Sequence, residues 1–94
     1  MEKNNKLIAE FMGAYFDDKG ITRLRGRFHT FRVKTLNLKY HTSWDWLMPV
    51  INKCFDVAED GQMSDIMHHL QVAEMDSTYD AVVEFINNYN NQNN

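Results

Sequence analysis

The 94-residue sequence contains a single cysteine and a single proline, and it has no long hydrophobic run. One cysteine excludes an internal disulfide and favours a reducing compartment, so we predict a cytoplasmic location. The apolar runs are only a few residues long, whereas a transmembrane helix needs about 20 residues. The N-terminus also lacks the pattern of a signal peptide. These absences predict a small soluble protein without membrane association.

Acidic residues are absent from one part of the chain. Residues 19–44 hold seven Lys or Arg and no Asp or Glu, whereas residues 1–18 hold four acidic and two basic residues. Residues 45–94 hold nine acidic residues and a single base, Lys53. This segregation has two explanations. The basic segment lies beside acidic helices of the same chain, or it binds an anionic partner.

The composition predicts one folded domain that spans residues 1–94. An apolar fraction of 44% is ordinary for a globular chain and too high for a disordered one. A chain of this length forms a single core. Six of the last eight residues are Asn, so we expect a frayed tail from about residue 90.

Apolar side chains at helical spacing predict three helices outside the middle of the chain. The first covers residues 4–16, with Tyr15 on its buried face. A shorter helix covers residues 63–73. The last begins at Asp76 or Ser77 and buries a face that includes several aromatic and β-branched residues: Tyr79, Val82, Val83, Phe85, Ile86 and Tyr89.

A central helix is predicted around the two tryptophans, with Thr42 or Ser43 as its N-terminal cap and Gly61 as its C-terminal cap. Its apolar stripe is wide, which indicates burial on more than one side, and Cys54 falls on that stripe. Pro49 either bends this helix or marks its first regular turn. The apolar spacing continues through Pro49, so we favour one bent helix.

Residues 21–41 favour strands, because helical spacing disappears and β-branched and aromatic residues become frequent. One strand is predicted at 28–33, and a second at 36–40, where Leu36, Leu38 and Tyr40 alternate. The fold class is therefore α+β, with three to four helices packed with a small antiparallel sheet formed by residues 27–41.

Two segments carry a resemblance to a known group of proteins. They are Trp44-Asp45-Trp46-Leu47-Met48-Pro49-Val50-Ile51 and Tyr79-Asp80-Ala81-Val82-Val83-Glu84-Phe85-Ile86. With the opening at Ile8 to Gly13 and the entry at Tyr40 to Trp44, the chain resembles short uncharacterised proteins of phages and prophages from gut bacteria. It is similar, more distantly, to the phage ABA sandwich domains. The resemblance implies helices packed with a small sheet, and it implies no activity and no functional residue.

The basic segment is the strongest candidate for a binding site, and its cations are interleaved with aromatic residues. The cations are Arg23, Arg25, Arg27, Arg32, Lys34 and Lys39. Such a mixture can neutralise phosphates and stack bases. The interpretation favoured from sequence alone is a solvated sheet face whose arginines pair with the acidic helices, with charges and aromatics mixed on both faces.

The remaining chemistry-bearing residues predict no catalytic, metal or cofactor site. His68 and His69 are adjacent and point about 100° apart on a helix, so one ion rarely binds both. We expect one of them to be exposed and the other to border the core. No acid–base or nucleophilic set can be assembled, and no cofactor is implied.

Trp44 and Trp46 are candidate interface aromatics, although core positions are favoured in a chain this small. If one apolar row of the central helix stays exposed, a homodimer is expected. The function predicted from sequence is a non-enzymatic, phage- or prophage-derived accessory protein that acts by protein–protein interaction with an unknown partner. The alternative is a nucleic-acid-binding module that uses the basic strand region 23–39.

Overall fold

The computed structural model describes residues 2–16, 20–25, 30–34 and 37–92. These residues form four helices, α1 (Glu2–Phe11), α2 (Trp44–Val57), α3 (Ser64–Gln71) and α4 (Met75–Gln92). They also form three strands, β1 (Tyr15–Phe16), β2 (Ile21–Arg25) and β3 (Thr30–Lys34), in one antiparallel sheet with the order β1-β2-β3. The α+β fold class is therefore confirmed.

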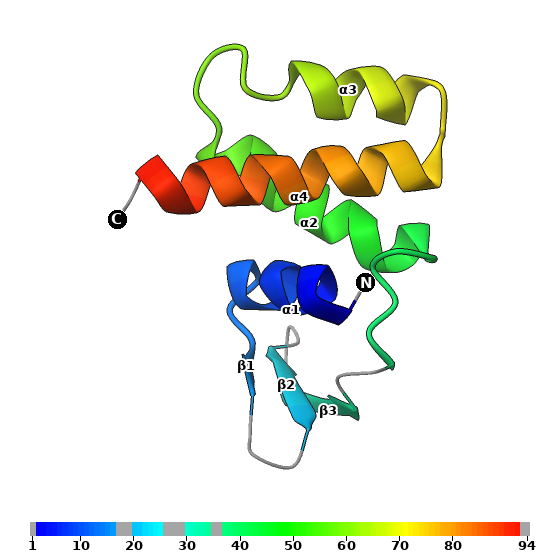
Figure 1. Cartoon of the computed structure of the whole chain (residues 1–94), viewed down its shortest axis with the longest axis vertical. Coiled ribbons are helices and arrows are strands. Elements are labelled where there is room, and N and C mark those ends of the chain that lie inside the picture. Colours follow the sequence, from blue (N-terminus) through cyan, green and yellow to red (C-terminus); the bar gives the residue numbers. More distant parts are fainter. Residues whose placement is uncertain (1, 17–19, 26–29, 35–36, 93–94) are drawn as a thin grey trace.

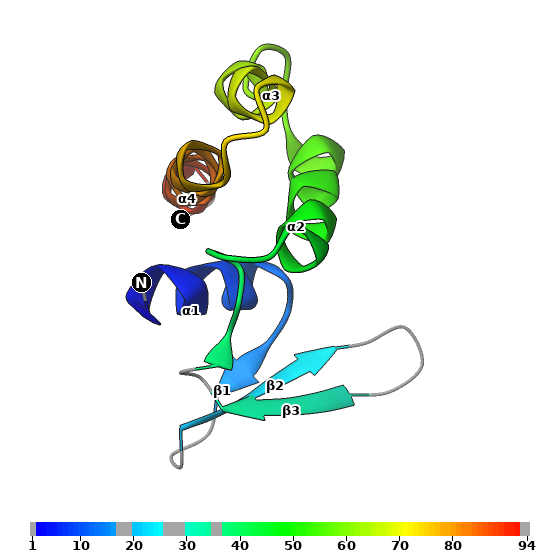
Figure 2. The ribbon, with the colours of Figure 1, turned by 90° about the vertical axis from the view of Figure 1, so that its right-hand side faces the viewer.

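The elements follow one another along the longest dimension of the molecule, which is 38 Å. Figures 1 and 2 show α3 at one end, then α4 and α2, then α1, and the sheet at the other end. Helix α4 packs against α1, α2 and α3. The C-terminal helix, rather than the tryptophan-containing helix, is therefore the element at the centre of the helical part. None of the described helices combines the length and the hydropathy that crossing a membrane requires.

The core lies where the helices meet, and each helix contributes side chains that are almost fully buried. They include Ile8, Leu47, Val50, Ile51, Ile66, Val82 and Ile86. The predicted buried face of α4 is confirmed, with Tyr89 half-buried and the other five residues buried. On α2 both predicted apolar rows contribute buried side chains, although Met48 and Phe55 are exposed.

Helix α1 ends at Phe11, so the predicted helix over 4–16 is too long. Gly13 has φ +89°, the left-handed conformation that glycine adopts without steric cost. The N–H of Gly13 donates to the carbonyl of Glu10, and the N–H of Ala14 donates to that of Ala9, both at 2.9 Å. This pair of bonds is a Schellman motif, which ends the helix and redirects the chain into β1. Tyr15 is consequently a strand residue and not part of a buried helix face.

The predicted strand over 36–40 is also wrong. Residues 37–43 connect the sheet to α2 without forming a strand. Leu38 and Tyr40 are buried because this connection packs against the helices, which explains their alternation without strand pairing. Strand β3 pairs with β2, and β2 pairs with β1. Part of the strand predicted at 28–33 lies outside the described residues.

Helix α2 begins after Ser43, one of the two predicted caps, although the Ser43 side chain makes no capping hydrogen bond. The helix continues through Pro49 as one element. Pro49 lies on the exposed side, where water can bind the carbonyl of Asp45 that has lost its helical donor. The C-terminal cap is Ala58 in an extended conformation, so the prediction of Gly61 as the cap is wrong.

Helix α4 begins at Met75, before the predicted caps Asp76 and Ser77, which lie in its first turn. The side chain of Ser77 instead donates to a carboxylate oxygen of Glu74 at 2.9 Å. The helix continues to Gln92, beyond the residue where fraying was expected to begin. Fraying itself stays a prediction.

Candidate anion-binding face

The register of the sheet gathers cationic side chains on one of its faces. Residues directly opposite each other on neighbouring antiparallel strands point to the same side. Arg23 lies opposite Tyr15 on β1 and opposite Arg32 on β3, and Lys34 lies opposite Ile21. Since Lys34 is two residues from Arg32, it shares this side. We call Tyr15, Arg23, Arg32 and Lys34 the basic face.

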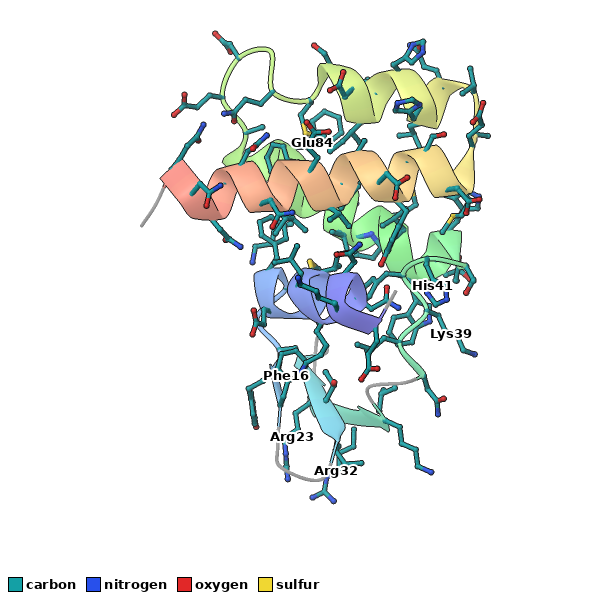
Figure 3. All side chains as sticks on the ribbon, in the orientation of Figure 1. Phe16, Arg23, Arg32, Lys39, His41 and Glu84 are labelled. Carbon is teal, nitrogen blue, oxygen red and sulfur yellow. The ribbon has the colours of Figure 1, made fainter. Side chains whose placement is uncertain are left out.

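The opposite face of the sheet is turned toward the helices. Thr22 is fully buried there, and Phe16 and Val33 pack against the core cluster. The ammonium group of Lys6 on α1 lies 5.1 Å from the ring centroid of Phe16. The basic face therefore points away from the helical part. Figure 3 shows Arg23 and Arg32 at the end of the molecule farthest from α3 and α4.

The basic face is accessible. Tyr15 is 59% exposed, and Arg32 and Lys34 are exposed as well. The guanidinium carbon of Arg23 lies 6.0 Å from the ring centroid of Tyr15, at the outer limit of a cation–π contact. Arg23 and Arg32 lie directly opposite each other, and like charges at such positions of an antiparallel pair are destabilising.

The acidic residues of the described chain lie elsewhere. Helix α1 separates the sheet from α2, α3 and α4, which carry most of the exposed carboxylates, such as Glu84 (Figures 2 and 3). Within the described residues, no carboxylate forms an ion pair with Arg32 or Lys34. The predicted solvated sheet face agrees with the exposure of Arg32, whereas the predicted pairing with the acidic helices is wrong for this arginine. The prediction that charges and aromatics mix on both faces is wrong for the cations whose side chains are described, because Arg23, Arg32 and Lys34 share one face.

The structure brings together only some of the predicted cations. Arg25 lies in β2 at a position that shares the side of Arg23 by register, but its side chain is outside the described part. Arg27 also lies outside it. Lys39 is exposed in the connection to α2 and is not a residue of the sheet.

Tyr15 is the residue of this face that sequence reasoning missed. Its spacing from Leu7, Ile8 and Phe11 fits a helix, and that spacing hid its position on a strand. The signal that could have revealed this position is Gly13. Glycine readily adopts positive φ, and this conformation at Gly13 ends α1 at Phe11.

The candidate interface aromatics Trp44 and Trp46 are half-buried at the start of α2 and pack against the core. The ring of Trp46 meets that of Tyr40 edge to face, with centroids 5.2 Å apart and an interplanar angle of 86°. This geometry is a core contact between aromatic rings. Both tryptophans lie away from the basic face.

In the part of the chain that the structure describes, the other nucleophilic or metal-binding groups do not assemble into a site. Cys54 is fully buried, as predicted, and burial raises the pKa of its thiol to about 12, so the reactive thiolate is suppressed. His68 is exposed and His69 half-buried, also as predicted. No group of three metal-binding side chains occurs among the residues described. A hollow between α3 and α4 encloses about 70 Å³, too little for a substrate of ordinary size.

No protein-family model matches this chain, and no curated protein or solved structure matches it either. The resemblance to phage and prophage proteins stays a prediction.

Proposed function

We propose that this chain is a non-enzymatic binding protein that holds nucleic acid on the basic face of its sheet. The observation that carries the proposal is the cross-strand placement of Arg23 and Arg32, with Lys34 beside them, on a face that points away from the helices. Phosphate groups are the partners that such a set of cations would neutralise.

The overall negative charge of the chain does not oppose this proposal. Electrostatic attraction acts over roughly a Debye length, which is about 10 Å at 0.1 M salt. The acidic helices α3 and α4 lie toward the other end of a molecule 38 Å long. A polyanion that approaches the sheet therefore meets a local positive field.

The test is a fluorescence anisotropy titration with labelled DNA and RNA at several salt concentrations. We expect binding at about 50 mM salt that weakens as salt rises, because phosphate binding releases counterions. Lys34→Gln should reduce the salt slope by roughly 0.7–0.9. Lys3→Gln is the matched control, since Lys3 is exposed on α1, outside the sheet, and the charge change is the same.

Absence of binding to any nucleic acid at low salt would refute the proposal. Equal loss of affinity in Lys34→Gln and Lys3→Gln would also refute it, because binding would then depend on total charge and not on the basic face.

A second candidate function is binding of another protein through an apolar groove between the end of α2 and the start of α3. Phe55, Met63 and Met67 line this groove, and Phe55 is 47% exposed. Glu59 and Asp60 lie at the groove as well. The complementary occupant is a basic amphipathic segment of a partner protein. A symmetric homodimer through this groove would bring two acidic rims together, which is unfavourable.

Light scattering and a peptide titration test this second candidate. We expect a monomer at high protein concentration and binding of a synthetic Leu- and Lys-rich helical peptide, weakened by Phe55→Ser and unchanged in Tyr15→Ser. A stable dimer that Phe55→Ser dissociates would show instead that a second copy occupies the groove.

We also propose a phage or prophage origin and a cytoplasmic location. The origin is supported by the residue pattern at 44–51 and 79–86, and the location by the single free thiol of Cys54. Neighbouring genes for lysis, packaging or defence evasion would support the origin. A conserved bacterial housekeeping context would contradict it.

A further inference from the structure

We infer that the basic face takes single-stranded nucleic acid in preference to duplex, with the ring of Tyr15 as the stacking platform for one base. The inference rests on the proposed function and specifies its ligand. It follows from the position of one exposed aromatic ring within the set of cations.

Tyr15 is unusual among the aromatic side chains of the described sheet. Phe16, its neighbour on β1, packs toward the core, whereas Tyr15 exposes 59% of its surface on the basic face. Strand β1 is an edge of the sheet, so one side of Tyr15 is not flanked by another strand. A large ring held on a strand, with one neighbour and an open side, can accept a planar group.

The cations stand beside this ring in a fixed order. Tyr15, Arg23 and Arg32 form one row across the three strands, and neighbouring strands are about 4.8 Å apart. Arg32 is therefore roughly 10 Å from Tyr15, and Lys34 is displaced by about 7 Å along β3. A single strand with one base on Tyr15 can place its following phosphates over the two arginines and the lysine.

A duplex cannot use this arrangement in full. Its bases are stacked inside the double helix, so a tyrosine at the protein surface has no base face to contact. Duplex binding would depend on the cations alone. The face should therefore discriminate by strandedness, and the discrimination should depend on the aromatic ring.

The experiment compares full-length wild-type protein with four variants by fluorescence anisotropy at constant low salt. The probes are one labelled 20-nucleotide sequence as single-stranded DNA, as single-stranded RNA, and as the DNA annealed to its complement. Tyr15→Leu removes the ring and Tyr15→Phe retains it. Arg32→Gln removes a cation, and Phe55→Leu is the matched control for loss of an exposed aromatic ring at the other end of the molecule.

We expect tighter binding of the single strands than of the duplex. Tyr15→Leu should weaken single-strand binding by about tenfold and leave duplex binding nearly unchanged, while Tyr15→Phe retains wild-type affinity. Arg32→Gln should weaken binding of all three probes, and Phe55→Leu none of them. A difference in affinity between the two single strands would show whether the basic face prefers DNA or RNA.

Two results would overturn the inference and leave the proposed function standing. One is equal affinity for duplex and single strand with Arg32→Gln weakening both. The other is wild-type affinity of Tyr15→Leu for the single strands. Absence of binding to all three probes would overturn both the inference and the proposed function.

Discussion

At the scale of single residues, Ala73 is the position with a strained backbone. It has φ 56°, whereas the other described residues with positive φ are glycines. Its N–H donates to the carbonyl of Leu70, and that of Glu74 donates to His69, so Ala73 occupies the glycine position of the Schellman motif that ends α3. The left-handed conformation costs a non-glycine residue about 1–2 kcal/mol.

We expect Ala73→Gly to stabilise the protein by about 0.5–1 kcal/mol. The relief of strain exceeds the loss of about 0.4–1 kcal/mol that comes from the greater freedom of glycine in the unfolded chain. Urea denaturation measures the difference. Ala81→Gly is the control and should destabilise, because Ala81 lies in the interior of α4. A destabilised Ala73→Gly would contradict the assignment of strain.

Asn5 is the buried polar residue that joins three distant parts of the chain. Its amide nitrogen donates to the carbonyl of Leu38 at 3.2 Å and lies 2.9 Å from Nδ1 of His41. Its amide oxygen accepts a hydrogen bond from the hydroxyl of Tyr79 at 2.9 Å. Because the carbonyl of Leu38 can only accept, the amide orientation is fixed and Nδ1 of His41 acts as an acceptor.

Replacing Asn5 by Leu should lower the free energy of unfolding by about 2–4 kcal/mol, since buried partners lose their hydrogen bonds while the side chain keeps the same branching. Thermal and urea denaturation measure the loss. Asn52→Leu, on the exposed side of α2, should change stability by less than about 0.5 kcal/mol. Similar stabilities of the two variants would show that the network contributes little.

At the scale of the elements, Lys53 connects α2 to the end of α1. Its ammonium group donates to the carbonyl of Phe11 and lies 4.8 Å from the ring centroid of the same residue. Helix α1 has no basic residue in its own last turn. The single base in residues 45–94 therefore supplies the positive charge that the C-terminus of α1 favours.

We expect Lys53→Met to destabilise the protein by about 1–2 kcal/mol, because the variant loses the hydrogen bond and the interaction with the helix dipole. Lys3→Met makes the same change of charge near the start of α1 and should be nearly neutral. Chemical denaturation of both variants at the same ionic strength provides the comparison. Equal destabilisation would mean that net charge, and not this contact, is responsible.

The helices could be located from the sequence, whereas only the presence of a small sheet, and not the pairing of its strands, could be. The apolar spacing in α2, α3 and α4 reflects local geometry, so it predicts each helix to within a few residues. Strand β1 has two residues and no pattern of its own. Its pairing with β2 depends on the backbone conformation of Gly13, which ends α1 and directs the next residues toward β2. Apolar spacing does not reveal such a pairing.

The same limit applies to the candidate site. The cations at Arg23, Arg32 and Lys34 were identified from charge alone, but their common face depends on the register of β2 with β3. A shift of one residue would move every side chain to the other side of the sheet. The alternation of Thr22 with Arg23 is visible in the sequence. Which of the two side chains faces the helices is known only from the burial of Thr22.

At the scale of the whole molecule, one buried thiol and two buried phenols determine how the stability of the fold responds to alkaline pH. Burial raises the pKa of Cys54, Tyr40 and Tyr79 to about 12, from ordinary values of 9.0 for the thiol and 10.0 for the phenols; Asp80 adds to the shift of Tyr79. Between the ordinary pKa values and about pH 12, these groups stay protonated in the folded chain and are deprotonated in the unfolded chain. Stability is therefore complete below about pH 9 and falls as the pH rises toward 12.

Urea denaturation at pH 7, 9 and 11 should show a nearly constant free energy of unfolding up to about pH 9 and a marked decrease at pH 11. At pH 8 the native protein should leave Cys54 unreactive toward a thiol-specific disulfide reagent, and urea should expose it. An unchanged free energy at pH 11, or rapid reaction of the native thiol at pH 8, would show that these groups are not shielded by the core.

The separation of charge along the molecule predicts how the intact protein meets a charged surface. With a net charge of −3, a protein of uniform charge would pass through a sulfonate cation exchanger at neutral pH. This protein should be retained at low salt, because it can orient the basic face toward the resin. The acidic end of a molecule 38 Å long is then screened over a Debye length of about 10 Å at 0.1 M salt.

The double variant Arg32→Gln/Lys34→Gln should elute earlier, whereas Lys3→Gln should elute close to the wild type. If the wild-type protein fails to bind the resin, the cations at the end of the sheet do not form a continuous positive field, and the proposed binding of nucleic acid loses its physical basis.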